Sequence, residues 1–140
     1  MIYRLGNFAK YKVSFLPAKL LITLLYVILD RLIVRGIFGC LIPSRTIIGW
    51  GLHIVHPNGI IINGNSKIGS NLKIHHQVTI GQSGNDYPVI GDDCYIGAGA
   101  KIIGKARLGN NIKVGANAVV TKSFKSNSIL VGVPAKYMKA

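Results

Sequence analysis

The sequence predicts an all-β solenoid preceded by an α-helical segment. Three observations carry this prediction. An aliphatic side chain recurs every six residues from Ile48 onward, and a glycine directly follows many of these aliphatic residues. The third observation is a change in composition near residue 40, because the chain before that point is apolar and basic and lacks the six-residue period. We therefore expect an N-terminal helical segment over residues 1–40 and the solenoid, with a C-terminal tail, over residues 41–140.

Residues 17–36, "PAKLLITLLYVILDRLIVRG", predict a helix. Pro17 suits the first helical position, and Gly36 can end the helix in a left-handed conformation. The polar residues recur at spacings of four, three and four and form one narrow stripe: Lys19, Thr23, Tyr26 and Asp30. The uncharged run from Leu20 to Leu29 is too short to span about 30 Å of hydrocarbon. Two placements stay open: packing against protein, in this chain or a neighbouring subunit, or lying in the plane of a membrane surface beside basic residues.

The six-residue period matches neither the 3.6 period of a helix nor the period of two of a simple strand. It fits a solenoid in which each flat face is a short strand and three hexads close one triangular coil. The aliphatic residues point inward, and about four coils follow from the length. Those residues fall into three phases: Ile48, Ile54, Ile60; Ile62, Ile68, Ile74, Ile80; and Ile90, Ile96, Ile102, Leu108, Val114, Val120. Residues that tolerate unusual backbone angles are expected at the turns: Asn71, Asp93, Gly99, Asn110, Asn111, Gly115 and Asn117.

The period slips twice. Ile62 follows Ile54 by eight residues, two more than one hexad, and Ile90 follows Ile80 by ten, through "QSGNDYPV". The inward face cannot accept the extra residues, so both must leave the coil and change the outer surface. Surface excursions of this kind on a regular scaffold are where functional sites are built.

Stacking the coils in register places His56, His76, Ala98 and Ala116 in one column, with neighbouring coils about 4.8 Å apart. An imidazole titrates near neutrality, so His56 can take a proton from a hydroxyl, with His76 either assisting or only packing beside it. The small residues beyond, with Gly99 at the turn, leave a groove for a thin extended chain such as the pantetheine arm of coenzyme A. Four scattered lysines are available for its phosphates: Lys101, Lys113, Lys122 and Lys136. N–H groups near Gly81 could stabilise an oxyanion.

Residues 42–138 are similar to the hexapeptide-repeat acyltransferase superfamily. The repeats "IGAGAKI" and "VGANAVV" and the tail "VGVPAKYM" carry the resemblance. It implies a left-handed parallel β-helix, acetyl-CoA as the donor, no metal, and a trimer with each cleft between two subunits. The segment "HPNGIIING" resembles the block around the catalytic histidine of serine-acetyltransferase-like members, with His56 at that histidine, and Ala98 and Ala116 match alanines that flank the acyl-CoA arm.

The sequence departs from serine acetyltransferases at three positions. Val55 stands where they carry an aspartate before the histidine, Leu41 where the carboxylate partner of the histidine falls, and Tyr87 where a second histidine falls. From these departures we expect the acceptor to be a hydroxyl of a sugar or cell-surface polysaccharide precursor. Serine is kept as the alternative acceptor, and a non-catalytic β-helix scaffold as the alternative to an enzyme.

The composition limits which kinds of binding partner are expected. Seventeen Lys and Arg against four Asp and Glu give a net charge of +13, which favours anionic partners of any kind. The basic residues are not interleaved with aromatic ones, so no nucleic acid is expected. The histidine spacing lacks the pattern of the zinc-dependent carbonic anhydrases built on the same solenoid. We expect a cytoplasmic protein, with residues 17–36 as a possible contact to the inner face of the membrane; Cys40 and Cys94 fit a reducing compartment.

Overall fold

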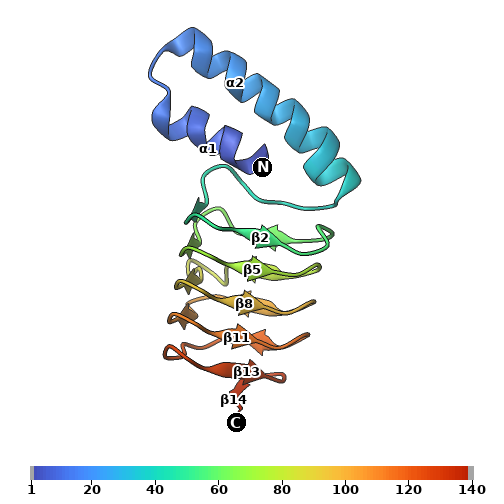
Figure 1. Ribbon diagram of the computed structural model, residues 1–140, viewed down its shortest axis with the longest axis vertical. Helices are drawn as coiled ribbons and strands as arrows, with labels where there is room; N and C mark the ends of the chain where they lie inside the picture. The colour runs from blue at the N-terminus through green and yellow to red at the C-terminus, as the bar shows by residue number, and fades with distance from the viewer. Residues whose placement is uncertain (1, 139–140) are drawn as a thin grey trace.

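Three short helical elements sit at one end of a parallel β-helix in the computed structural model, which describes residues 2–138 (Figure 1). Helix α1 covers Ile2–Lys12 and α2 covers Leu16–Leu29, and the π-helical segment η1 (Asp30–Ile37) continues α2 without a break. The β-helix then winds away from the helices, so that the described chain ends at the opposite end of the molecule (Figure 1).

The β-helix has three faces, each built from one short strand per coil. The first face has the order β1-β4-β7-β10, the second β2-β5-β8-β11-β13-β14, and the third β3-β6-β9-β12. All neighbours are parallel except β13 and β14. The strands are β1 (Ile47–Ile48), β2 (His53–Ile54), β3 (Ile61–Ile62), β4 (Lys67–Ile68), β5 (Lys73–Ile74), β6 (Thr79–Gly81), β7 (Val89–Ile90), β8 (Tyr95–Ile96), β9 (Lys101–Ile103), β10 (Arg107–Leu108), β11 (Lys113–Val114), β12 (Val119–Val120), β13 (Ile129–Val131) and β14 (Lys136–Tyr137).

The core is the stack of aliphatic side chains inside the coils. Equivalent residues lie directly above one another, as in the pairs Ile54–Ile74, Ile74–Ile96 and Ile96–Val114. Every aliphatic residue of the predicted period is buried except Ile54, which is half-buried. The prediction of about four coils with the aliphatic residues inward is therefore confirmed.

The turns between faces use left-handed backbone at most of the predicted positions. Asn71, Asp93, Gly99, Asn111 and Asn117 have φ between 53° and 71°. Asn110 lies at a bend and Gly115 directly before a turn, but neither has a positive φ. Side-chain amides at the left-handed positions also bond from coil to coil, since Asn71 Nδ2 donates to Asp93 Oδ1 at 2.9 Å. The turn residues thus stabilise the stacking and the bend together.

The predicted helix over residues 17–36 exists, with two changes at its ends. It begins one residue earlier, at Leu16, so Pro17 lies in the first turn, where its missing N–H costs no hydrogen bond. Gly36 does not end it, because η1 continues to Ile37 and Gly39 takes the left-handed conformation, with φ 59°. The wider π-helical turn lets the N–H of Cys40 reach the carbonyl of Val34 at 2.8 Å, which joins the helix end to the first coil.

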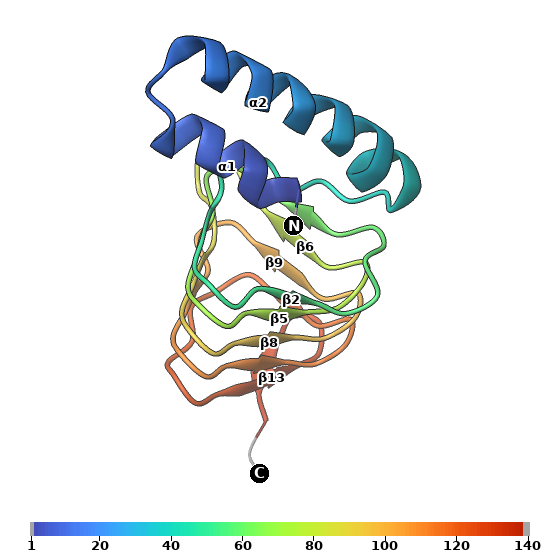
Figure 2. The ribbon, with the colours of Figure 1, turned by 45° about the horizontal axis from the view of Figure 1, so that its top comes forward.

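Helix α1 lies between α2 and the first coil (Figure 2). Its Tyr3 hydroxyl donates to the carbonyl of Thr46, and Arg4 donates to the carbonyl oxygen of Ile48 at 2.8 Å. Gly6 allows close approach to α2, because a Cβ there would lie 2.7 Å from the Tyr26 ring. The helices are therefore fixed to the solenoid by buried polar contacts of α1, and the side of α2 away from α1 stays uncovered.

Candidate active site

The first slip of the period is a bulge that begins at His56. The hydrogen-bond ladder is regular up to Val55 and resumes where the N–H of Gln77 donates to the carbonyl of Asn58 at 2.8 Å. His56 and Pro57 are thus the two extra residues that leave the coil. Asn58 takes the column position next to His76, so the prediction that His56 itself stands in the column is wrong. His56 has φ 55°, in the left-handed region that residues other than glycine seldom adopt. The bulge turns the His56 side chain to the surface, where it is exposed.

The bulge keeps the two imidazoles in contact. The ring centroids of His56 and His76 are 6.1 Å apart, with the planes inclined at 66°. Nδ1 of His76 is buried and has no hydrogen-bond partner within residues 2–138. A buried polar atom of this kind is uncommon in folded proteins and often marks a place where a ligand or water binds.

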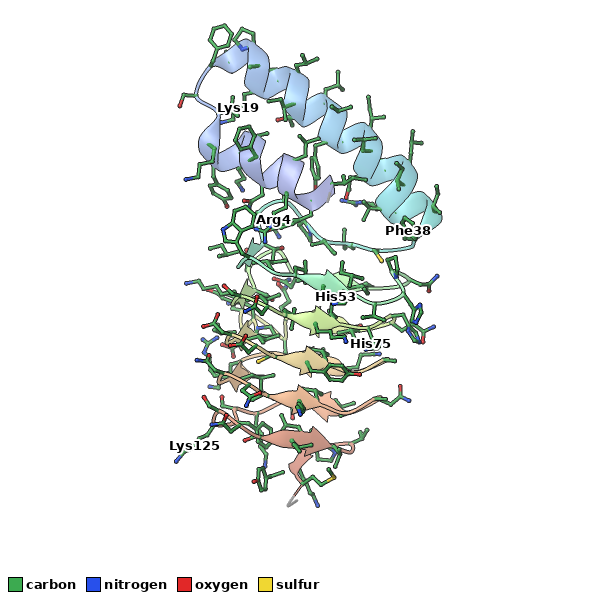
Figure 3. All side chains as sticks on the ribbon, in the orientation of Figure 1. Arg4, Lys19, Phe38, His53, His75 and Lys125 are labelled. Carbon is green, nitrogen blue, oxygen red and sulfur yellow. The ribbon has the colours of Figure 1, made fainter. Side chains whose placement is uncertain are left out.

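A third imidazole lies next to the pair. The rings of His75 and His76 are 6.5 Å apart, and the Tyr95 ring packs on His75 at 5.2 Å. Burial, followed by the positive charge of Lys73, lowers the pKa of His75 below its ordinary value of 6.5. His75 is therefore neutral over a wider pH range than a solvated histidine. His53 and His75 lie on the second face of the β-helix (Figure 3).

The small residues predicted for the cofactor groove continue the column below His76. The N–H of Gly99 donates to the carbonyl of His76 at 3.0 Å, and the N–H of Asn117 donates to the carbonyl of Ala98 at 2.8 Å. Ala98 is half-buried, and Ala116 on the next coil is exposed. A Cβ on Gly99 would lie 2.1 Å from Asn117 Oδ1, so only glycine fits this turn without a shift of that side chain.

Lys101 places a positive charge beside this column. Its Nζ donates to the carbonyl oxygen of Gly99 at 2.7 Å and to that of Gln77 at 3.1 Å. The sequence marked Lys101 only as one of several scattered lysines. No local pattern separates it from the others, because its position depends on how the third face turns away from the column.

The other predicted cofactor residues lie apart from the column within one chain. Gly81 ends β6 and Lys122 follows β12, both toward the far end of the third face from the column. Lys122 Nζ lies 5.6 Å from the centre of the Phe124 ring. Lys136 is on β14, at the last coil. Their roles toward a cofactor stay predictions.

A partly open apolar pocket lies on the other side of the His56 bulge. A cavity of about 260 Å³ separates η1 from the first coil, and its lining includes Asp30, Ile54 and Pro57. This cavity explains why Ile54 is less buried than the other aliphatic residues. Asp30 is 3% exposed and accepts a hydrogen bond from Arg35 Nε at 2.6 Å. The sequence placed Asp30 only in the polar stripe, since its approach to the bulge depends on how the helices pack.

No three His, Cys, Asp or Glu side chains within residues 2–138 form a group that could hold a metal ion. In the same range, no helix combines the length and the hydrophobicity needed to cross a bilayer.

Residues 87–122 match the family described as bacterial transferase hexapeptide (six repeats). Serine acetyltransferase of Mycobacterium tuberculosis is 37% identical over 106 residues, which cover 73% of this chain and 46% of the relative. That of Helicobacter pylori is 39% identical over 106 residues, covering 73% of this chain and 62% of the relative. The chain belongs to the hexapeptide-repeat acyltransferase superfamily, on its serine-acetyltransferase-like side. It spans about half the length of the first of these relatives.

Solved structures of serine acetyltransferases match nearly the whole of this chain. Neisseria gonorrhoeae serine acetyltransferase in complex with serine has a TM-score of 0.79 and 34% identity, covering 96% of this chain and 53% of that one. A serine acetyltransferase in complex with CoA has a TM-score of 0.81 and 28% identity, covering 98% of this chain and 54% of that one. The solenoid is therefore the left-handed β-helix of the hexapeptide-repeat superfamily, and the two N-terminal helices belong to the shared fold.

These comparisons correct the expected acceptor. The prediction of a sugar or polysaccharide hydroxyl is wrong, because the matching relatives and structures are serine acetyltransferases. The prediction gave three local departures, Val55, Leu41 and Tyr87, more weight than the similarity of the rest of the chain. A few side chains around an acceptor can change while the scaffold and the histidine stay in place, so such departures are weak grounds for naming another substrate.

Proposed function

We propose that this chain is an acetyl-CoA-dependent serine O-acetyltransferase. The observation that carries the proposal is the likeness to a serine acetyltransferase bound to serine, at a TM-score of 0.79 over 96% of the chain. The likeness to a CoA complex, at a TM-score of 0.81, supports coenzyme A as the carrier of the acetyl group. The bulged His56 beside His76, at the head of a column of small residues, supplies chemistry that suits this reaction.

His56 acts as the general base. A ring nitrogen of the neutral imidazole accepts the proton of the serine hydroxyl as its oxygen attacks the thioester carbonyl. The C–S bond of the tetrahedral intermediate then breaks, the acetyl group stays on the serine oxygen, and the imidazolium returns its proton to the leaving thiolate. The exposed position of His56 allows both substrates to reach it.

His76 acts as a positioning residue. Serine acetyltransferases carry acidic residues at the positions of Val55 and Leu41, and neither of these side chains can orient an imidazole by a hydrogen bond. The edge-to-face contact at 6.1 Å between the two rings supports a packing role for His76 instead. Such a role predicts that His76→Asn changes the pH profile of kcat as well as its size.

The column below the histidines holds the acyl-CoA arm. Ala98 and Ala116 leave room for a narrow chain, and Lys101 Nζ adds a positive charge near Gly99. The exposed side of the column fits a cleft that a neighbouring subunit closes, so we propose a homotrimer. The predicted residues Gly81, Lys122 and Lys136 would then meet the cofactor from the neighbouring subunit.

The test is release of free thiol from acetyl-CoA with L-serine as acceptor. Wild type, His56→Ala, His76→Asn and His53→Ala are compared, because His53 is an exposed histidine outside the column and controls for simple loss of an imidazole. We expect His56→Ala to lower kcat by about 10² or more, in the range for loss of a general base, and His53→Ala to match wild type. Equal rates for wild type and His56→Ala would contradict the assignment. A wild type that shows no binding of acetyl-CoA by calorimetry would support the scaffold alternative.

A further inference from the structure

The side of α2 that faces away from α1 and the β-helix is apolar and uncovered. We call it the α2 outer face and define it by Leu16, Leu20, Leu21, Leu24, Ile28 and Leu32. These side chains are between 46% and 69% exposed. Several large apolar residues side by side on one helix form a contiguous patch of the kind that marks an interaction site.

Two residues of the polar stripe are turned inward, the reverse of an ordinary surface helix, while Thr23 is exposed. Tyr26 and Asp30, from the predicted stripe, are among the buried residues, and Asp30 pairs with Arg35. A surface helix of a globular protein normally buries its apolar side. The packing of α2 therefore buries two of the four stripe residues and leaves much of its apolar side for another surface.

The charge of the helical segment indicates which kind of surface covers the α2 outer face. Residues 1–40 contain six Lys and Arg but one acid, Asp30, which is buried. Lys10, Lys12 and Arg31 are exposed, so the solvent-facing charge of the helical segment is positive. A second copy of the chain would bring two positive surfaces together, whereas an anionic bilayer offers hydrocarbon for the leucines and negative head groups for the cations.

The position of α2 allows such contact. It lies at one end of the molecule, beyond α1, and the β-helix extends away from it (Figures 1 and 2). Since no described helix can cross a bilayer, α2 would lie in the plane of the interface. We propose that the α2 outer face docks on an anionic lipid surface. This inference does not rest on the acceptor of the proposed reaction.

The test is flotation of the full chain with lipid vesicles, because aggregated protein does not float. Vesicles of phosphatidylcholine alone are compared with vesicles that contain phosphatidylglycerol, at about 0.15 M salt. We expect wild type to float with the anionic vesicles. Leu21→Ser/Leu24→Ser removes apolar contact without changing charge and should weaken binding by about tenfold or more. Lys12→Gln/Arg31→Gln should weaken binding by about tenfold and only on the anionic vesicles.

The matched control is Lys105→Gln/Lys125→Gln, which removes the same charge from exposed residues of the β-helix. Figure 3 shows Lys125 at the end of the β-helix opposite to α2. This control should change binding by less than about twofold, since long-range charge is screened beyond about 8 Å. Absence of wild-type flotation, or equal flotation of the leucine variant, would overturn the proposal. So would a lipid-free wild type with twice the molar mass of the leucine variant, which would make the face a contact between copies.

Discussion

The substitution Ile96→Ala should destabilise the fold strongly, while Ile54→Ala on the same face should not. Ile96 is fully buried between Ile74 and Val114, and its coil is hydrogen-bonded to a neighbouring coil on each side. Removing three carbon atoms forfeits about 2.4 kcal/mol of transfer free energy. A residual cavity of roughly 70 Å³, at about 24 cal/mol per Å³, adds roughly 1.7 kcal/mol, because coils held at strand spacing cannot collapse into it. We expect a loss of about 4 kcal/mol in the free energy of unfolding.

Ile54 offers an internal comparison. It is half-buried, has a neighbouring coil on one side only, and lines the 260 Å³ cavity under η1. Its truncation enlarges an existing space, so we expect a loss of about 1 kcal/mol, roughly half the transfer term. Urea unfolding followed by circular dichroism, at one fixed protein concentration, measures both values. Equal losses for the two variants would refute the reasoning, because they would mean that the helices pack on Ile54 as tightly as the coils pack on Ile96.

Three further predictions follow from single groups. Gly99→Ala should cost about 1–2 kcal/mol, because the new Cβ must adopt φ 71° and displace Asn117 Oδ1; an unchanged urea midpoint would contradict this. Because the folded chain lowers the pKa of His75, this imidazole binds a proton more weakly in the folded chain than in the unfolded chain. His75 therefore contributes no pH dependence to stability well above pH 6.5, and it destabilises the fold as the pH falls through that value. His75→Gln should therefore lose less stability than wild type between about pH 7 and pH 5, and the His75 ring signals should titrate below 6.5. Cys40 and Cys94 are buried free thiols, and burial raises the pKa of Cys94, so a disulfide reagent should react with both only after unfolding; fast reaction of the folded chain would contradict their burial.

The register of the coils is enough to predict much of the candidate active site. The slip between Ile54 and Ile62 was enough to predict that residues near His56 leave the coil, and counting coils placed His76 beside it. The local backbone differs in detail, because Asn58 takes the hydrogen-bonding position and His56 stands on the bulge. Counting residues cannot decide which members of an eight-residue segment are the extra ones. Pro57 lacks an N–H and cannot adopt a left-handed angle, whereas Gly59 has φ 60° and stands at the position equivalent to Gln77, with φ 56°.

The sequence by itself determined the solenoid, its three faces and the residues that fill it, because a period of six constrains each coil by its own local geometry and by the coil beside it. Only the tertiary structure decided how the N-terminal helices pack and which of their residues are buried. Whether Asp30 faces solvent or the cavity beside Pro57, and whether the leucines of α2 face inward or outward, depends on how α1 inserts between α2 and the first coil. The pattern of a single helix fixes which residues share a side, but the partner that covers that side comes from contacts far apart in the chain.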